Sequence, residues 1–217
     1  MAVTSWRFAS SGANVDTIGS VSWAAPEEIV SDDANRAYAD SMAAGTITNW
    51  LRAYFGFTTS DVPVGSTIDG IESEVDTYGV STHSVRFYAA RLVIGGTIGG
   101  TNVSGMPSTN WGGTGSDAPL TLGGASNLWA SAPTASDCVG ATFGVAIAAE
   151  NYEASKARNA RVDYIKMRIY YTLGAGDVVG GASGGRRTGD IPWMSRTWRP
   201  IPNFVRRNRI LVPAWIG

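Results

Sequence analysis

The stretch Ala160–Thr172, ARVDYIKMRIYYT, carries the clearest structural pattern in the chain. Large apolar side chains occupy every second position over most of its length, at Ile165, Met167, Ile169 and Tyr171. The positions between them hold Lys166, Arg168 and Tyr170. Because successive side chains of a β-strand point to opposite faces, this alternation predicts a strand with one face in a core and the other in solvent.

Four more stretches read as strands: Asn49–Phe57, Ser66–Gly79, Ser84–Gly96 and Phe143–Asn151. In the first, we expect one face to consist of Leu51, Ala53, Phe55 and Phe57. In the second, Ile71, Ser73 and Val75 share one face, and we expect Glu72, Glu74 and Asp76 on a solvent face. FGVAIAAEN (Phe143–Asn151) has no polar face until its end, which predicts a central strand buried on both sides.

The composition favours short strands joined by many turns. The chain has 27 glycines and only 16% charged residues, against a usual value of about 25%. VIGGTIGGTN (93–102) predicts a tight hairpin, and the long stretch 102–119 predicts a connection that crosses between two sheets. Helix signals are weak, with a turn or two expected in 25–42 and one capped turn after Thr134 or Ser136. These features predict an all-β fold, an antiparallel jelly-roll-like β-sandwich followed by an extended irregular C-terminal arm.

We divide the chain into a sandwich domain over residues 1–173, a Gly-rich linker over 174–189 and an arm rich in Pro, Trp and Arg over 190–217. Residues 1–22 are expected to include an extended segment.

The charge of the chain is unevenly distributed. Residues 175–217 contain seven arginines and two aspartates, which gives this part a net charge of +5. The whole chain has a net charge of −1, so the remainder carries −6. A basic segment on an acidic body is typical of proteins that bind a partner.

The arm is too rich in proline for a regular helix or a central strand, and burial of its own side chains does not clearly outweigh the entropy lost on ordering it. We therefore expect it to dock on neighbouring protein subunits, with tryptophans in pockets and arginines on acidic side chains. The expected contact residues are Trp193, Arg196, Trp198, Arg199, Phe204, Arg206, Arg207, Arg209 and Trp215. Three alternatives are a fold-back onto the sandwich, a nucleic-acid contact and a membrane interface, and none of the three is our expectation.

Few residues offer catalytic or metal-binding chemistry. His83 and Cys138 are single, so a zinc site built from several such ligands and an internal disulfide are both excluded. We expect a surface histidine and a small buried cysteine. Asp32 and Asp33 with Asp40 are candidate calcium ligands, although a capped turn or solvated loop explains them more simply.

Two further groups allow a functional and a structural interpretation. The row Glu72, Glu74 and Asp76 could mimic a glycosidase carboxylate pair, but a solvated face, or one that meets a basic neighbour, is the expected state. Trp111, Trp129 and Tyr152 could stack on sugars, although tryptophans in sandwiches usually fill cores or loop bases. We expect no cofactor, no metal and no enzymatic activity.

The order of several phrases resembles a β-sandwich found in many tailed-phage structural proteins. They are SWAAPEEIVSDDANRAYAD, LRAYFGFTTSDVPVGSTIDGIESEV, VRFYAARLVIGGTIGGTN, LTLGGASNLWASAPTASDCVGATFGVAIAAEN and ARVDYIKMRIYYT, and the resemblance covers roughly Trp23 to Thr172. The resemblance implies a jelly-roll-like sandwich in a virion component such as a decoration, fibre or tail protein. It implies no catalytic residues, and the arm lies outside it.

The expected function is that of a phage virion structural protein, a capsid decoration or cement protein anchored to capsid or tail subunits by its arm. The alternative is a tail or fibre protein whose sandwich binds a glycan or receptor. We expect a homo-oligomer, with a trimer as the candidate arrangement, that is located in the virion after synthesis in the host cytoplasm. The first residues do not have the layout of a signal peptide, and no run approaches the ~20 apolar residues of a membrane span.

Overall fold

The computed structural model describes residues 1–79, 84–106, 111 and 117–174. Most of the expected linker, the whole of the expected arm and His83 lie outside the described residues. The arm residues expected to contact partners therefore lie outside them as well, namely Trp193, Arg196, Trp198, Arg199, Phe204, Arg206, Arg207, Arg209 and Trp215.

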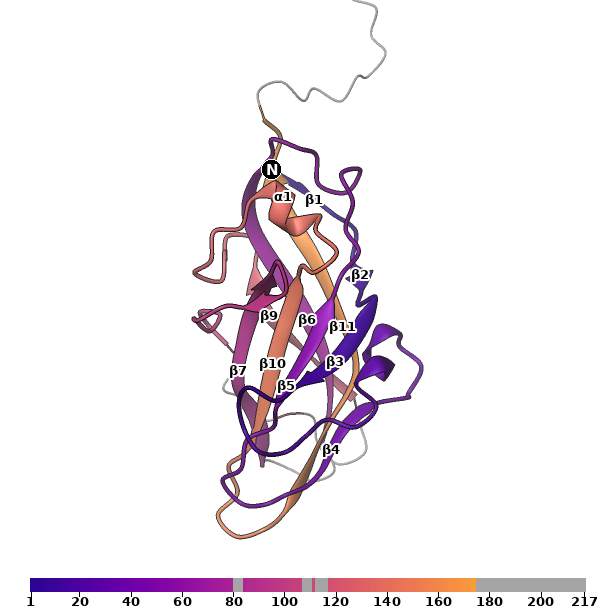
Figure 1. The fold of residues 1–217 in the computed structure, drawn as a ribbon, viewed down its shortest axis with the longest axis vertical. Coiled ribbons are helices and arrows are strands. Elements are labelled where there is room, and N and C mark those ends of the chain that lie inside the picture. The colour runs from indigo at the N-terminus through magenta and orange to yellow at the C-terminus, as the bar shows by residue number, and fades with distance from the viewer. Residues whose placement is uncertain (80–83, 107–110, 112–116, 175–217) are drawn as a thin grey trace, which may run out of the picture. The chain divides into compact units, whose positions relative to one another are not determined.

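The described residues form two antiparallel sheets that pack face to face (Figure 1). The first sheet contains β1 (Ala2–Val3), β2 (Arg7–Phe8), β4 (Ala37–Met42), β6 (Thr67–Gly79), β9 (Asp117–Gly124) and β11 (Arg158–Thr172). The second contains β3 (Ser11–Val15), β5 (Trp50–Tyr54), β7 (Val85–Ile94), β8 (Thr97–Ile98) and β10 (Gly144–Asn151). A 3-10 helix, η1 (Pro26–Val30), and a short α1 (Ala135–Cys138) complete the described secondary structure.

The connectivity is that of a jelly roll. In the first sheet, the strands from β4 onward are ordered β4-β11-β6-β9, and in the second they are ordered β5-β10-β7-β8. The pairs β4–β11, β5–β10, β6–β9 and β7–β8 therefore form as if one long hairpin had been wrapped around the core. The predicted all-β sandwich is confirmed, and so is the crossing from β8 in one sheet to β9 in the other.

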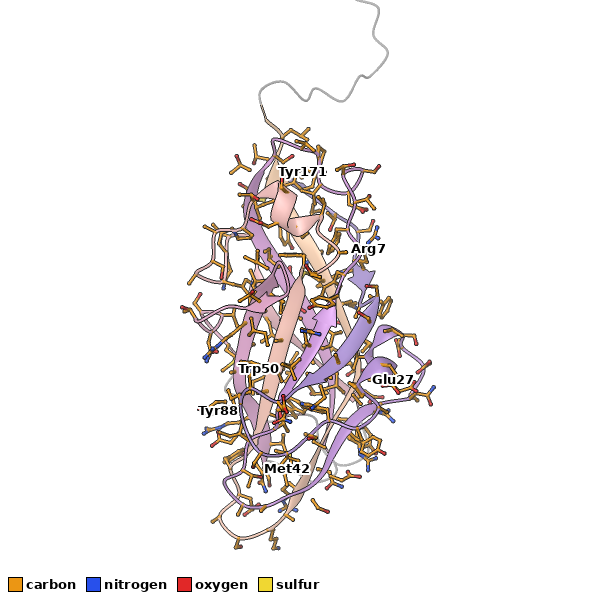
Figure 2. All side chains as sticks on the ribbon, in the orientation of Figure 1. Arg7, Glu27, Met42, Trp50, Tyr88 and Tyr171 are labelled. Atoms are coloured by element: carbon orange, nitrogen blue, oxygen red, sulfur yellow. The ribbon has the colours of Figure 1, made fainter. Side chains whose placement is uncertain are left out.

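The core lies between the sheets and follows the predicted alternation. Ile165, Met167 and Ile169 of β11 are fully buried, as are Leu51 and Ala53 of β5. β10 lies between β5 and β7, and nearly all of its residues are buried. Its Ala146 and Ala148 belong to a second apolar cluster with Trp50, which is labelled in Figure 2. The prediction of a central strand buried on both faces is confirmed.

The N-terminal segment is extended, and it joins the two sheets along one edge. β1 and β2 pair with β11, and β3 pairs with β5. The change of sheet occurs within one residue, since the Ala9 amide donates to the Ile165 carbonyl (2.9 Å) and the Ser10 amide donates to the Tyr54 carbonyl (2.7 Å). Pairing of this kind covers strand edges that would otherwise expose free backbone groups.

The turn signals agree in part with the structure. Gly95 and Gly96 have φ of 57° and 82° in the β7–β8 hairpin, which is the left-handed conformation that a two-residue hairpin turn needs. Thr134 caps α1 through a reciprocal capping box with Asp137. Residues 25–42 hold the expected helical turn as η1, but they also form strand β4, which the sequence did not predict.

Replacement of Gly144 by alanine should destabilise the sandwich strongly. A Cβ atom at this position would lie 1.9 Å from the Ala53 carbonyl oxygen on the paired strand β5. Relief of this overlap requires the β5–β10 ladder to separate, and we expect the free energy of unfolding to fall by at least about 2 kcal/mol. Urea denaturation measures the change. Gly100→Ala is the control, because a Cβ there meets no atom within 4 Å; equal stabilities of the two variants would contradict the predicted packing.

Candidate functional site

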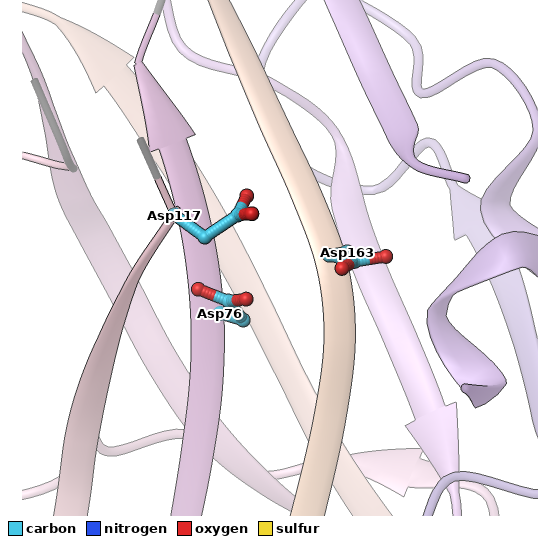
Figure 3. Close-up of side chains that lie close together, drawn as sticks. All are labelled: Asp76, Asp117 and Asp163. Atoms are coloured by element: carbon cyan, nitrogen blue, oxygen red, sulfur yellow. The ribbon is translucent and has the colours of Figure 1, made fainter. Parts of the chain in front are cut away.

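Three aspartates from neighbouring strands form the most unusual polar group in the described part of the chain. They are Asp76 of β6, Asp117 at the start of β9 and Asp163 of β11. One carboxylate oxygen from each lies within 4.8 Å of the others. Figure 3 shows Asp76 and Asp117 side by side, with Asp163 facing them from the adjacent strand. We call these three residues the aspartate cluster.

Strand pairing and one irregularity bring the cluster together. Asp117 is opposite Tyr78 in the β6–β9 ladder, so it is a diagonal neighbour of Asp76. In the β6–β11 ladder the register shifts between Val162 and Ile165, and Asp163 and Tyr164 together occupy the position opposite Asp76. Such a β-bulge re-aims side chains, and here it turns Asp163 to the same side of the sheet as Asp76.

The cluster is buried on one side and open on the other. Asp76 and Asp163 are only 4% and 1% exposed, although both lie on the sheet face that points away from the core. In each, the Oδ1 atom is buried and has no hydrogen-bond partner. Asp117 is exposed. The arrangement therefore has two enclosed oxygen atoms without a donor and a third carboxylate at the surface.

Arg36 lies beside the cluster and neutralises part of its charge. Its Nη2 donates to both oxygens of Asp117, at 2.8 and 3.1 Å, and its guanidinium stacks over the ring of Tyr78 at 4.5 Å. Its Nη1 donates to the Ala34 carbonyl. Both terminal nitrogens of Arg36 thus have partners outside Asp76 and Asp163.

Burial and mutual repulsion shift the protonation of the cluster. Burial, together with the charges of Asp117, Asp163 and Asp32, raises the pKa of Asp76 to about 6, and Arg36 opposes this shift. Burial also raises the pKa of Asp163, against the stabilising effect of the Ala34 amide. At low pH the cluster holds protons, and at neutral pH it holds closely spaced negative charges.

The sequence placed only one member of the cluster. Asp76 was expected on a solvent face with Glu72 and Glu74, and it does lie on the outward face of the sheet, but it is buried there and only 4% exposed. Asp117 and Asp163 were not predicted as site residues. A signal for Asp163 exists, because Val162 and Ile165 are both apolar and the two residues between them break the alternation.

The rest of the carboxylate row meets basic neighbours, as one of the expectations for it stated. Glu72 accepts from Arg168 at 2.8 Å, and Glu74 lies 2.7 Å from the Lys166 ammonium. The hydroxyl groups of Tyr170 and Tyr164 donate to Glu72 and Glu74 respectively. Each glutamate is therefore held by a cation and a hydroxyl from β11, which favours a structural role over that of a glycosidase pair.

Asp32, Asp33 and Asp40 do not form the calcium site considered from the sequence. Asp33 closes a turn, since it accepts from the Ser31 hydroxyl at 2.9 Å and from the Asn35 amide at 3.0 Å. These contacts lower the pKa of Asp33. Asp40 lies 3.7 Å from Arg161. Within the described ranges, these three carboxylates do not come together at ligand distance.

The tryptophans considered for sugar stacking belong to the core. Trp129 is fully buried, and its indole donates to the Ile71 carbonyl at 3.0 Å. Trp111 is 2% exposed and stacks on Trp23. The sugar-stacking interpretation is wrong for both residues, because the ring faces that a sugar would contact are covered by the protein. Tyr152 alone of the three is exposed.

Cys138 is a buried core residue, as predicted. It is 0% exposed, and burial raises the pKa of its thiol to about 12, so it is neither an accessible nor an activated nucleophile.

Comparisons with protein-family models, with curated proteins and with solved structures found no match for this chain. Among the residues that the structure describes, no helix is long and apolar enough to span a membrane.

Asp76 should make the stability of the metal-free protein fall as the pH rises from about 4 to about 6. The folded state holds the Asp76 proton up to a pKa of about 6, whereas the unfolded chain releases it near 3.8. The stabilising contribution of this proton, at most about 3 kcal/mol, is complete below the lower value and lost above the upper one. Asp76→Asn should remove this loss, and urea denaturation at several pH values in EDTA measures it.

The relevant quantity is the difference between wild type and variant, because other carboxylates contribute to both curves. Asp69→Asn is the control, since Asp69 lies on the same strand but is hydrogen-bonded to Thr172. Parallel curves for wild type and Asp76→Asn would show that Asp76 titrates normally in the folded protein.

Proposed function

We propose that this chain is a structural protein of a tailed-phage virion, and within that class a capsid decoration or cement protein. The single observation that carries the proposal is the correspondence between the phage-like phrases and the jelly-roll strands. VRFYAARLVIGGTIGGTN covers the β7–β8 hairpin, FGVAIAAEN covers β10 and ARVDYIKMRIYYT covers most of β11. The phrases that suggested a virion sandwich thus cover strands β7, β8, β10 and β11 of a jelly-roll sandwich.

The fold is compatible with this role but does not select it. Jelly rolls occur in viral capsid proteins and also in lectin domains and cupins. A fold hosts many functions, so the choice among them depends on particular residues. The charge-paired face of Glu72 and Glu74 with Lys166 and Arg168 supports a passive scaffold role, because its ionic groups already satisfy one another.

The proposed anchor is the segment 190–217, on the basis of its sequence. Tryptophans such as Trp193 and Trp198 would fill pockets on neighbouring subunits, and Arg206, Arg207 and Arg209 would bind acidic side chains in bidentate geometry. In a homo-oligomer such as a trimer, several such segments would bind one particle together, and their effective concentration would multiply weak contacts.

Removal of residues 188–217 should abolish incorporation into particles and leave the sandwich folded. Incorporation is measured by co-sedimentation of the purified protein with particles that lack it, and folding by thermal unfolding followed by circular dichroism. A truncated protein that unfolds like the full chain and still joins particles at wild-type levels would refute the anchor.

Point variants separate the proposed contacts from simple charge attraction. Replacement of Trp193, Trp198 and Trp215 by alanine should reduce particle affinity more than tenfold, as loss of interface anchors does. Replacement of the five arginines after residue 190 by lysine keeps the charge but removes bidentate geometry, and should also weaken binding. Retained affinity in the lysine variant, with steep salt dependence, would instead favour a nucleic-acid contact.

The tail or fibre alternative makes a different prediction. Attachment of the protein to host cells, without incorporation in the capsid, would favour that alternative.

A further inference from the structure

We propose that Asp76, Asp117 and Asp163 bind a divalent cation of the size of Ca²⁺ on the outer face of the first sheet. The inference does not depend on the proposed function, because it concerns a site within the sandwich itself.

The spacing of the carboxylates fits calcium. Ca²⁺ binds oxygen ligands at about 2.3–2.6 Å, so two ligand atoms on opposite sides of the ion are at most about 5 Å apart. The three oxygen atoms of the cluster lie within 4.8 Å of one another. Mg²⁺ demands a strict octahedron and gives up its water ligands reluctantly, so a site that supplies several protein carboxylates favours Ca²⁺. The ligands are all oxygens from carboxylates, which also favours Ca²⁺ over zinc.

The unpartnered oxygens are an independent indication that the cluster binds a cation. Oδ1 of Asp76 and Oδ1 of Asp163 are buried in residues that are 4% and 1% exposed, and neither accepts a hydrogen bond. A buried charged oxygen without a partner is costly, so such groups in proteins are normally paired or bound to a metal. Two of them in one group of carboxylates indicate a cation rather than a single local defect.

The same two strands show how carboxylates are satisfied elsewhere on this face. Glu72 is opposite Arg168 and Glu74 is opposite Lys166 in the β6–β11 ladder, and each forms an ion pair with its opposite residue. At the next outward position of β6, the bulge places Asp163 beside Asp76. Like charges in adjacent positions destabilise a sheet. A bound cation would take the place that a basic side chain holds at the two preceding positions.

The surroundings allow an ion to enter and to keep water ligands. Asp117 is exposed and forms the open side of the cluster. Arg36 contacts Asp117 but leaves Oδ1 of Asp76 and Oδ1 of Asp163 free of partners, so it competes for only one of the three ligands.

The expected affinity for Ca²⁺ is low, because the positive charge of Arg36 lies close to the ion. We expect a Kd of about 10⁻⁴–10⁻³ M, as in extracellular calcium modules. The charged and titratable groups that influence the cluster are Asp32, Arg36, Asp76, Asp117, Asp163 and Tyr164.

The test uses the full chain at about pH 7.5, above the pKa of Asp76, so that protons do not compete. Thermal unfolding is compared in EDTA and in about 10 mM CaCl₂ at constant ionic strength. Wild type should gain about 5–10 °C in Tm, and the gain should saturate with Ca²⁺ concentration. Asp76→Asn and Asp163→Asn should lose this gain. Both substitutions keep the side-chain volume and remove repulsion, so both variants should fold. Asp69→Asn on β6 is the matched control and should respond like wild type.

A direct measurement on the wild type removes any dependence on the variants. Tb³⁺, a luminescent substitute for Ca²⁺, should show emission sensitised by the nearby Tyr78 and Tyr164, and Ca²⁺ should displace it at lower concentration than Mg²⁺ does. A saturable response that disappears in Asp76→Asn supports the site. Absence of any Ca²⁺ effect on folded wild type, an equal effect in Asp76→Asn, or equal displacement by Mg²⁺ would overturn the proposal.

Discussion

The fold depends on the pairing of β11 along both of its edges. One edge of this 15-residue strand is bonded to β6, and the other is shared by β1, β2 and β4. Its inward side chains, Ile165, Met167 and Ile169, are fully buried between the sheets. A strand that is bonded on two sides and buried on one satisfies its backbone and also supplies the core. Strands β1, β2 and β4 have their place in the first sheet because β11 is there.

The same strand also contributes to a group of carboxylates whose buried oxygens have no hydrogen-bond partner. Over Lys166 and Arg168 its regular register brings cations against the glutamates of β6, and the face is charge-balanced. At the bulge, one extra residue places Asp163 against Asp76 and leaves buried oxygens without donors. A shift of one residue in register therefore replaces the cation–carboxylate pairs of this face with two adjacent carboxylates.

The predictions that depended on a few neighbouring residues were confirmed, whereas features that depend on contacts between distant segments were missed or misinterpreted. Burial of β10 on both faces and the capped turn at Thr134 were predicted, because apolar runs and capping residues act within a few residues of each other. Strand β4 was missed, because ANRAYADSM has only weak alternation and is held by its pairing with β11. Trp111 and Trp129 were considered as sugar contacts because they lie in loops, but loop residues can still pack into the core that the sheets enclose.

The sequence by itself determined strands β5, β6, β7, β10 and β11, most of their inward faces, the tight hairpin and the sandwich class, because alternation and turn chemistry are local properties of the chain. Only the tertiary structure decided that Asp76, Asp117 and Asp163 meet, since they lie on three strands far apart in sequence and one of them is turned by a bulge. The physical reason is that side-chain direction follows from the backbone of one strand, whereas the neighbours of a side chain follow from the register between strands.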